Sequence, residues 1–369
     1  MTDAELSKLK SACHTLLTGH RALSPADTFT RMAQWCEQHQ VDFDTYGDGP
    51  VVQEFEQKIA SLLGMEAGLF CITGTMTQAT ALRLATQERR SPLVGLHASS
   101  HILIHERSNF QTLQHFQSIT LGQPHRPWAL KDLTSQVEPL AALQIELPMR
   151  EIGGQLPTWD ELEAIKAHCH AHQIHLHMDG ARLWEAAAFY GKTLKEIAHG
   201  FDTVYVSFYK GMAGMAGAML LGKPAFLAKA KVWIHRLGGN VFRRTPYVAS
   251  VAMQFDERLA AMPAYFQRTQ QLYDILHHYP QFRTNPAQPQ ANMLHLHLPV
   301  APEKAIAIRN TIAQQHGIWL FNNAVASALP DSSMFEWYVG DQLLTMSDER
   351  LRQALDLFAN ALESASTPG

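Results

Sequence analysis

Residues 174–222 read IHLHMDGARLWEAAAFYGKTLKEIAHGFDTVYVSFYKGMAGMAGAMLLG, and this stretch decides the fold class. Two short apolar runs, Ile174–Met178 and Thr203–Phe208, have the length and composition of buried parallel strands. Roughly twenty residues between them follow a helical pattern. This strand–helix–strand order predicts a βαβ unit, the building block of a mainly parallel sheet with helices on its faces.

Side chains of opposite charge follow the two predicted strands. Asp179 comes directly after the first strand, and Lys210 follows the second. Ligands of open α/β sheets bind at the carboxyl ends of the strands, so both side chains should face one crevice. A cofactor with a protonatable ring nitrogen and an aldehyde needs this pair, which favours pyridoxal 5′-phosphate. Taken singly, the aspartate also fits a helix cap and the lysine a solvated loop.

A segment upstream predicts an anion site. Gly68–Ile72 is a short apolar run that leads into Thr73, Gly74 and Thr75, and a helical pattern continues over Gln78–Ala85. The free N–H groups at a helix start, a glycine that lets the backbone approach, and threonine hydroxyls can together hold a phosphate. As a bare motif, Thr-Gly-Thr is more often a helix cap.

Composition narrows the class of protein. The chain has 369 residues, of which 46% are hydrophobic and 17% are charged, which suits one large and one smaller globular domain. The net charge of −4 lacks the positive excess that is typical of proteins that bind nucleic acid or an anionic membrane. The four cysteines form no CxxC pair, and the N-terminal pattern is not that of a signal peptide. We therefore expect reduced thiols and a cytoplasmic location.

Three parts are expected along the chain: an N-terminal helical arm (1–22), a large cofactor-binding α/β domain (23–250), and a linking helix with a small C-terminal α+β domain (251–369). A long helix over Ser250–Tyr273 should join the last two parts. The strand at Asn292–Pro299 alternates clearly, which is typical of a half-buried sheet. Ser347 is expected to cap the last helix.

A histidine cluster follows a predicted helix over Trp159–Ala171. Its members are His168, His170, His172, His175 and His177. Their spacing alone would allow a metal site. However, no carboxylate or cysteine ligand set accompanies them, and cations also suit a helix C-terminus, so we expect no metal.

The segments described above, in this order, resemble the L-threonine aldolase and β-eliminating lyase family of pyridoxal phosphate enzymes. The resemblance runs from about Asp44 to Ser250 and rests on DTYGDGPVVQEFEQKIASLLGMEAGLF, TGTM, HMDGARLWEAAAFYG and FDTVYVSFYKG. It implies the aspartate aminotransferase fold (fold type I), with a large α/β domain and a small α+β domain. It also implies a homodimer or homotetramer that acts on a small amino acid substrate.

The resemblance assigns roles by position. It implies that Lys210 forms the Schiff base with the cofactor, that Asp179 partners the ring nitrogen, and that Arg182 helps to hold that aspartate and the ring oxygen. It implies that Gly74 and Thr75 form the phosphate cradle.

The segment SSHILIHE is similar to the family's AHxYxxE pattern. His101 falls where the family has the histidine that stacks on the cofactor ring, and Glu106 matches the glutamate of that pattern. Because histidine titrates near neutral pH, His101 is also the candidate base for the substrate hydroxyl.

Positions that should select the substrate depart from the family pattern. The chain reads Glu-Leu-Pro-Met-Arg over 146–150, where the family usually reads Glu-Asn-Thr-His-Asn, so Met149 replaces a substrate-handling histidine. Glu336 aligns with the usual arginine for the substrate carboxylate. Arg150 could compensate, because guanidinium suits carboxylate in bidentate geometry. The family arginine after the Gly-Gly turn is displaced, and Arg243, Arg244 or neither of them replaces it.

Three functions follow from the resemblance and its departures. The first is an aldolase that cleaves Cα–Cβ of a β-hydroxy-α-amino acid to glycine and an aldehyde. The second is a β-eliminating lyase or deaminase that acts on a different amino acid. The third is a protein that binds pyridoxal phosphate without turnover, which the altered substrate positions keep open.

Overall fold

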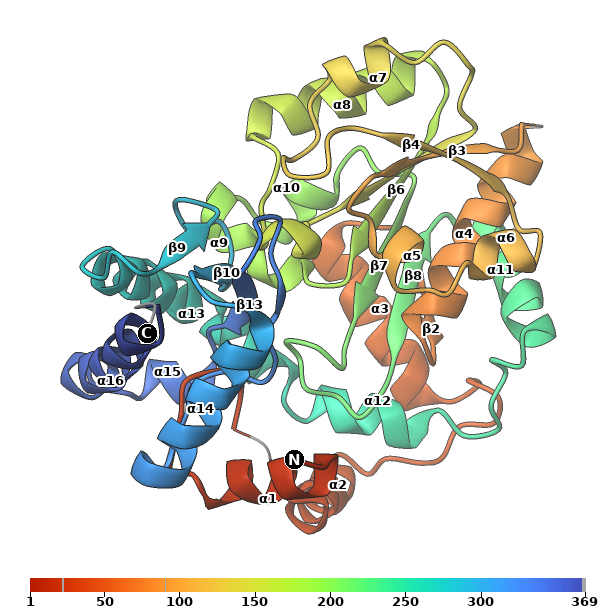
Figure 1. Ribbon diagram of the computed structural model, residues 1–369. Helices are drawn as coiled ribbons and strands as arrows, with labels where there is room; N and C mark the ends of the chain where they lie inside the picture. The colour runs from red at the N-terminus through yellow and green to blue at the C-terminus, as the bar shows by residue number, and fades with distance from the viewer. Residues whose placement is uncertain (22, 90, 367–369) are drawn as a thin grey trace. The chain divides into compact units, whose positions relative to one another are not determined.

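The computed structural model describes residues 1–21, 23–89 and 91–366. The chain forms two compact units, of which the larger comprises residues 23–261 and the smaller comprises residues 1–22 and 262–369 (Figure 1). The N-terminal segment therefore groups with the C-terminal part instead of standing as a separate arm. The boundary at 261/262 lies inside helix α13 (Phe255–Leu276), and not at residue 250 as the sequence predicted.

A seven-stranded sheet forms the centre of the larger unit, in the order β2-β8-β7-β6-β5-β3-β4. Its strands are β2 (Ala67–Cys71), β3 (Leu93–His97), β4 (Gln117–Leu121), β5 (Ala142–Glu146), β6 (His175–Gly180), β7 (Thr203–Ser207) and β8 (Ala218–Gly222). Every neighbouring pair is parallel except those that involve β8, which runs antiparallel to both β7 and β2. The predicted mainly parallel sheet is thus confirmed.

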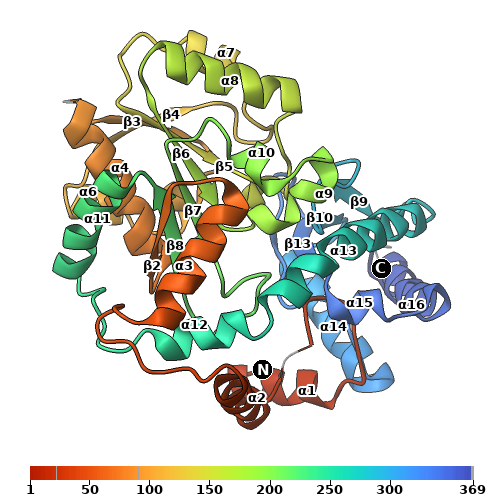
Figure 2. The ribbon, with the colours of Figure 1, turned by 180° about the vertical axis from the view of Figure 1, so that it is seen from behind.

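Helices cover both faces of this sheet. The helices of the larger unit are α2 (Pro25–Gln38), α3 (Pro50–Leu63), α4 (Gly74–Arg89), α5 (His101–Ile104), α6 (Asn109–Thr112), α7 (Lys131–Thr134), η1 (Arg150–Ile152), α8 (Trp159–Ala171), η2 (Leu183–Glu185), α9 (Ala187–Tyr190), α10 (Leu194–Ala198), α11 (Pro224–Arg236) and α12 (Thr245–Ala252). Figure 2 shows α3 in front of the sheet, and α4 packs on β6, β7 and β8. Because both faces are covered, β5 to β8 are entirely buried.

Two helices predicted from the sequence are interrupted in the structure. The crossover between β6 and β7 contains η2, α9 and α10 in place of one helix. Gly191 ends α9 in the left-handed conformation (φ 60°), and Thr193 with Glu196 forms a capping box that starts α10. The helix expected over Ser250–Tyr273 is likewise two, α12 and α13.

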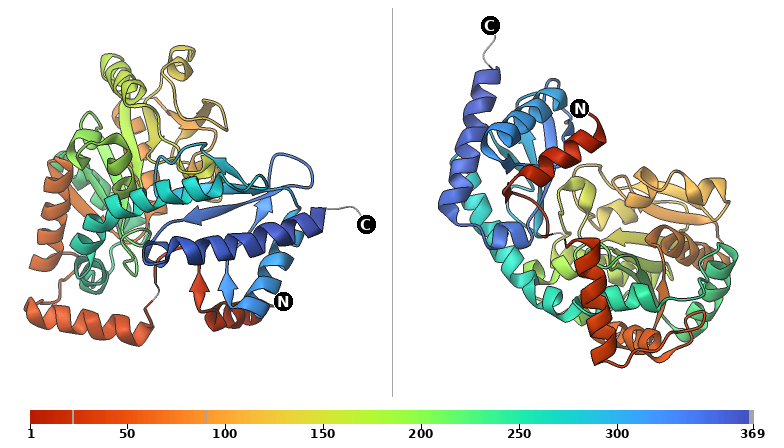
Figure 3. Two further views of the ribbon diagram at one scale, coloured as in Figure 1. Left: turned by 90° about the vertical axis from the view of Figure 1, so that its left-hand side faces the viewer. Right: turned by 90° about the horizontal axis from the view of Figure 1, so that it is seen from below.

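The smaller unit contains a four-stranded antiparallel sheet in the order β12-β13-β10-β9. Its elements are α1 (Asp3–Ala12), β1 (Thr15–Leu16), β9 (Arg283–Asn285), β10 (Met293–Leu298), α14 (Pro302–His316), β11 (Ile318–Trp319), β12 (Val325–Ala326), β13 (Ser333–Tyr338), α15 (Asp341–Leu344) and α16 (Asp348–Ser366). Figure 3 shows α16 running alongside the sheet, and Leu296, Phe335 and Phe358 share its core. Ser347 Oγ accepts a hydrogen bond from the Arg350 N–H at 3.2 Å, as the capping signal predicted.

Two histidines of β6 share one hydroxyl inside the larger unit. His175 Nε2 and His177 Nδ1 lie 2.9 and 2.8 Å from Thr203 Oγ1. Burial, followed by the neighbouring His175, lowers the pKa of His177 to about 3. These rings therefore serve the core in their neutral form. Among the described residues, no three His, Cys, Asp or Glu side chains group as metal ligands, and no helix is long and apolar enough to cross a membrane.

Acidification is expected to destabilise the protein through His177. The ring is neutral when folded and protonated when unfolded below pH 6.5, so its contribution is complete above that pH and falls as the pH drops toward 3. Between pH 6.5 and 4.5 the loss amounts to about 2.5 kcal/mol. Urea unfolding at several pH values should give a shallower pH dependence for His177→Leu than for the wild type or for the exposed-site control His199→Leu. Equal slopes in all three proteins would contradict this assignment.

Candidate active site

The carboxyl ends of β5, β6 and β7 bring the predicted ionic residues together. The register pairs Glu146 of β5 directly with Asp179 of β6, and Lys210 follows β7 by three residues. Burial lowers the pKa of Lys210; the charges of Asp179 and Glu146 raise it, and those of Arg182 and Arg150 lower it further. All four charged groups are therefore close enough to act on this amine. Residues predicted from separate stretches of sequence share one site.

Buried amides orient the carboxylate of Asp179. Its Oδ1 accepts a hydrogen bond from the Ala181 N–H at 3.1 Å, and its Oδ2 accepts one from Gln78 Nε2 at 2.9 Å. Gln78 Oε1 in turn accepts one from Gln144 Nε2 at 2.6 Å. These donors are neutral, so they fix the carboxylate without cancelling its charge. An oriented, charged carboxylate suits a protonated ring nitrogen. Neither glutamine was predicted from the sequence as a site residue.

The start of α4 suits an anion. A Cβ atom on Gly74 would lie 2.0 Å from the hydroxyl oxygen of Tyr205, so only glycine lets α4 begin this close to β7. Thr73 Oγ1 lies 3.5 Å from the Met76 N–H and Thr75 is exposed on the first turn. The N–H groups of this turn and the positive end of the helix dipole favour a phosphate.

His101 begins the short helix α5 beside the same strand ends. Its Nδ1 lies 3.3 Å from Glu106 Oε1, and Glu106 is buried. This hydrogen bond raises the pKa of His101; burial opposes the rise, and the charges of Asp179 and Lys210 act in opposite directions. The imidazole therefore lies within electrostatic reach of both predicted cofactor residues.

Glu146 connects two segments of the site. Its Oε1 accepts a hydrogen bond from the Arg150 N–H at 3.0 Å, and its Oε2 accepts one from the His101 N–H at 3.3 Å. Burial and then the charge of Asp179 raise the pKa of Glu146 to about 7, despite the opposing contributions of the Arg150 amide and of Lys210 and His101. A raised carboxyl pKa within a buried polar cluster is typical of functional sites.

Two arginines of the site have acidic neighbours. Arg182 Nη1 lies 3.8 Å from Glu185 Oε1, and Glu185 is buried. Arg150 Nη1 donates to Glu151 Oε1 at 2.9 Å, and His105 Nε2 lies 2.7 Å from the same oxygen. The Arg150 guanidinium is therefore oriented by Glu151 and remains one third exposed.

The structure places the other substrate-side positions in different surroundings. Met149 is fully buried, so an apolar side chain fills the position of the family histidine. Arg244 is also buried and donates to the Phe70 carbonyl at 3.1 Å and to Asn240, which is a structural role. Arg243 stacks on the ring of Phe242 at 4.3 Å. Glu336 belongs to β13 of the smaller unit.

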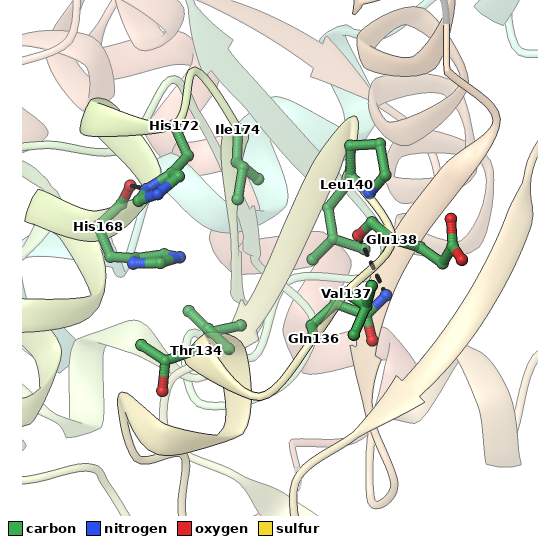
Figure 4. A pocket seen from close by; sticks show the side chains of 10 residues that line it. Thr134, Gln136, Val137, Glu138, Leu140, His168, His172 and Ile174 are labelled. Carbon is green, nitrogen blue, oxygen red and sulfur yellow. Dashed lines mark hydrogen bonds between the residues drawn. The ribbon is translucent and has the colours of Figure 1, made fainter.

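A cavity of about 540 Å³ lies at the amino ends of β5 and β6, opposite the carboxyl ends that carry the site residues (Figure 4). The end of α7 and the loop that follows it (residues 133–140) line one side, and His168, His172 and Ile174 line the other. The two imidazoles stack with ring centroids 4.1 Å apart. None of the residues assigned to the strand carboxyl ends contributes to this cavity, so we assign the chemistry to the carboxyl ends and not to the cavity.

The fold and this set of residues agree with a match to a known family. Residues 25–299 match the model of the beta-eliminating lyase family, and the chain belongs to that family. The family predicted from the sequence is confirmed.

Two curated proteins that the chain resembles are both named low-specificity L-threonine aldolases. The chain is 30% identical to the low-specificity L-threonine aldolase of Eremothecium gossypii, over 58% of this chain and 56% of that protein. It is 30% identical to that of Saccharomyces cerevisiae, over 62% and 61% of the two chains. The matched region thus spans less than two thirds of these curated relatives.

Solved structures match along almost the whole chain. A putative L-allo-threonine aldolase from Listeria monocytogenes is 35% identical, with a TM-score of 0.87 over 97% of this chain and 99% of that chain. A putative aromatic amino acid beta-eliminating lyase/threonine aldolase from Exiguobacterium is 32% identical, with a TM-score of 0.90 over 96% and 99%. These structures confirm the predicted fold type I.

Proposed function

We propose that this protein is a pyridoxal phosphate-dependent aldolase, a carbon–carbon lyase that cleaves a threonine-like β-hydroxy-α-amino acid to glycine and an aldehyde. One observation carries the proposal: Lys210, Asp179 and His101 lie at the carboxyl ends of neighbouring strands in a member of the beta-eliminating lyase family. The threonine aldolase names of the similar proteins support it.

Pyridoxal 5′-phosphate is the cofactor, and the residues present fit it. When bound, it supplies an electron sink for the carbanion that remains at Cα after cleavage. Burial lowers the pKa of Lys210, which increases the share of the neutral, nucleophilic amine that attaches the cofactor. Asp179 would hold the ring nitrogen protonated, and the start of α4 at Gly74 and Thr75 would hold the phosphate.

His101 is the residue that we propose to take the proton of the substrate β-hydroxyl. Its contact with Glu106 raises the pKa of the imidazole, so the ring is a stronger base than a free histidine and its cation is stabilised. Met149 is apolar and buried, so it cannot share this proton as the family's usual histidine would.

Arg150 is the residue that we propose to bind the substrate carboxylate. Its guanidinium is partly exposed, and its charge acts on Lys210, which supports a place beside the cofactor amine. Glu151 orients one side of this guanidinium, and the substrate carboxylate would approach its exposed part.

Replacing Arg150 with alanine is expected to raise KM for the amino acid by about 10- to 100-fold, because one charge-assisted contact is lost. The kcat should change much less, and cofactor binding should not change. Steady-state kinetics would be compared with Arg236→Ala, which removes an arginine that stacks on Trp233 of α11. An unchanged KM in Arg150→Ala would assign carboxylate binding to another residue.

The activity is tested with L-threonine, L-allo-threonine and phenylserine. The proposal requires glycine and aldehyde to appear at equal rates in the presence of pyridoxal phosphate. Release of a keto acid and ammonia would replace it with β-elimination. A protein that binds the cofactor and releases neither pair of products would have no turnover on these substrates.

We further propose a homodimer or homotetramer in the cytoplasm, with no nucleic-acid or membrane partner. Large apolar side chains are exposed on the larger unit at Phe29, Phe43 and Phe242, which supports a surface covered by another copy of the chain. All four cysteines are free, which suits a reducing compartment. Light scattering after size-exclusion chromatography measures the assembly.

A further inference from the structure

Glu146 holds the first residues of two short elements. It is the last residue of β5, it is buried, and it lies beside Asp179 in the register of the sheet. Its two carboxylate oxygens accept one main-chain N–H each, from His101 at 3.3 Å and from Arg150 at 3.0 Å. These two residues come from separate segments of the chain, so one side chain connects them.

Neither of these two short helices has a side-chain cap at its own N-terminus. Helix α5 has four residues and η1 has three, and neither N-cap, Ser100 or Met149, makes a side-chain capping hydrogen bond. The first N–H groups of a helix have no partner within the helix and need an acceptor from outside. Glu146 supplies that acceptor to both elements at once.

We propose that Glu146 is a positioning residue that sets His101 and Arg150 relative to each other across the active site. The inference rests on the proposed function, because that function gives His101 the substrate hydroxyl and Arg150 the substrate carboxylate. A shift of either short element would separate two groups that must contact the same amino acid. We call the two hydrogen bonds that Glu146 accepts from the His101 and Arg150 N–H groups the tether. Displacements of about 1 Å can cost about 100-fold in rate, so loss of the tether should affect substrate binding and turnover.

The protonation state of Glu146 should control this tether. The groups that face it are Asp179 from β6, Lys210 after β7, and His101 and Arg150 from the two short elements. A carboxylate accepts both N–H groups well, whereas a protonated carboxyl keeps one good acceptor oxygen. Because the pKa of Glu146 is raised to about 7, we expect the tether to be complete above neutral pH and weakened below it.

The experiment measures glycine binding to the cofactor-loaded protein by the change in the visible absorbance of the cofactor, from pH 6 to 8.5. Glycine is a product of the proposed reaction, and its binding requires no turnover. Glu146→Gln is expected to weaken glycine binding about tenfold or more at pH 8, because the neutral amide keeps only one acceptor oxygen and removes the charge from both contacts. The ionisation near pH 7 should disappear from its profile, while the dissociation constant of pyridoxal phosphate changes less than about threefold.

A second variant and a matched control complete the test. Glu146→Asp keeps the charge but retracts it by one methylene, so it should also weaken glycine binding while an ionisation remains in the profile. Glu161→Gln removes a carboxylate that likewise accepts a main-chain N–H, from Leu130 at 2.7 Å, and should behave as the wild type.

The outcomes separate this inference from the proposed function. Wild-type glycine affinity and an unchanged pH profile in both Glu146 variants would overturn the inference, whatever the turnover of the enzyme. Loss of glycine affinity in both variants would support it even if the wild type released no aldehyde, a result that would overturn only the proposed aldolase activity.

Discussion

Replacing Lys210 with alanine is expected to lower aldehyde release by at least about 10³-fold, because the covalent anchor of the cofactor is lost. The same change should prevent borohydride from fixing pyridoxal phosphate to the protein, which intact mass measures without any need for activity. The lowered pKa of Lys210 supports its assignment as the amine that attaches the cofactor.

Lys166 offers a matched control for this experiment. It is also a buried lysine whose pKa is lowered by burial, but it contacts Glu163 and the Ile197 carbonyl, away from the strand carboxyl ends. Lys166→Met should therefore lose stability and keep the borohydride-dependent mass increase. A Lys210→Ala protein that still gained this mass would show that another amine carries the cofactor.

Asp179→Asn is expected to reduce kcat by about 10²- to 10³-fold, because the neutral amide no longer stabilises positive charge on the ring nitrogen. Asparagine has the same shape and keeps one acceptor oxygen, so the hydrogen bond from Gln78 can persist while that from the Ala181 N–H is lost, and the fold should be retained. Asp202→Asn is the control, since Asp202 also accepts a main-chain N–H, from Leu176 at 2.8 Å, but at the opposite end of β6.

A pH profile supplies an independent readout of the same variant. The charge of Asp179 contributes to the raised pKa of Glu146 and also raises that of Lys210. Both pKa values should therefore fall in Asp179→Asn, and the ionisation near pH 7 should move to lower pH. If kcat and the profile stayed at wild-type values, Asp179 would have no role at the ring.

The sequence predicted those parts of the fold whose pattern is local. The runs that became β6 and β7 are mainly apolar and bounded by turn residues, and α8 begins and ends where predicted. Strands β3, β4 and β8 were not predicted. Residues 93–97 read LVGLH, with a glycine at the centre, and residues 117–121 read QSITL, with polar residues among the apolar ones. Segments with such weak patterns gain their strand conformation from neighbours in the sheet.

The ionic residues of the site were predictable because the carboxyl ends of parallel strands all lie on the same side of the sheet. Lys210 and Asp179 could be placed by that rule alone. The roles of Gln78, Gln144 and Glu146 could not be predicted, because the residue type does not show whether a polar side chain is buried or solvated. The sequence LQIEL of residues 143–147 does alternate, and this pattern puts Gln144 and Glu146 on the same face of a strand. Their partners come from α4, α5 and η1, and only tertiary contacts define them.

The short pairing of β1 with β11 has a consequence for the order of folding during synthesis. Thr15 pairs with Ile318, so the partner strand is made about 300 residues later. At roughly 5–20 residues per second, a ribosome needs about 15–60 s to cover that interval. The whole of the larger unit, residues 23–261, leaves the ribosome within it. The segment that forms β1 therefore has to wait unpaired for β11 while the sheet of the larger unit is synthesised.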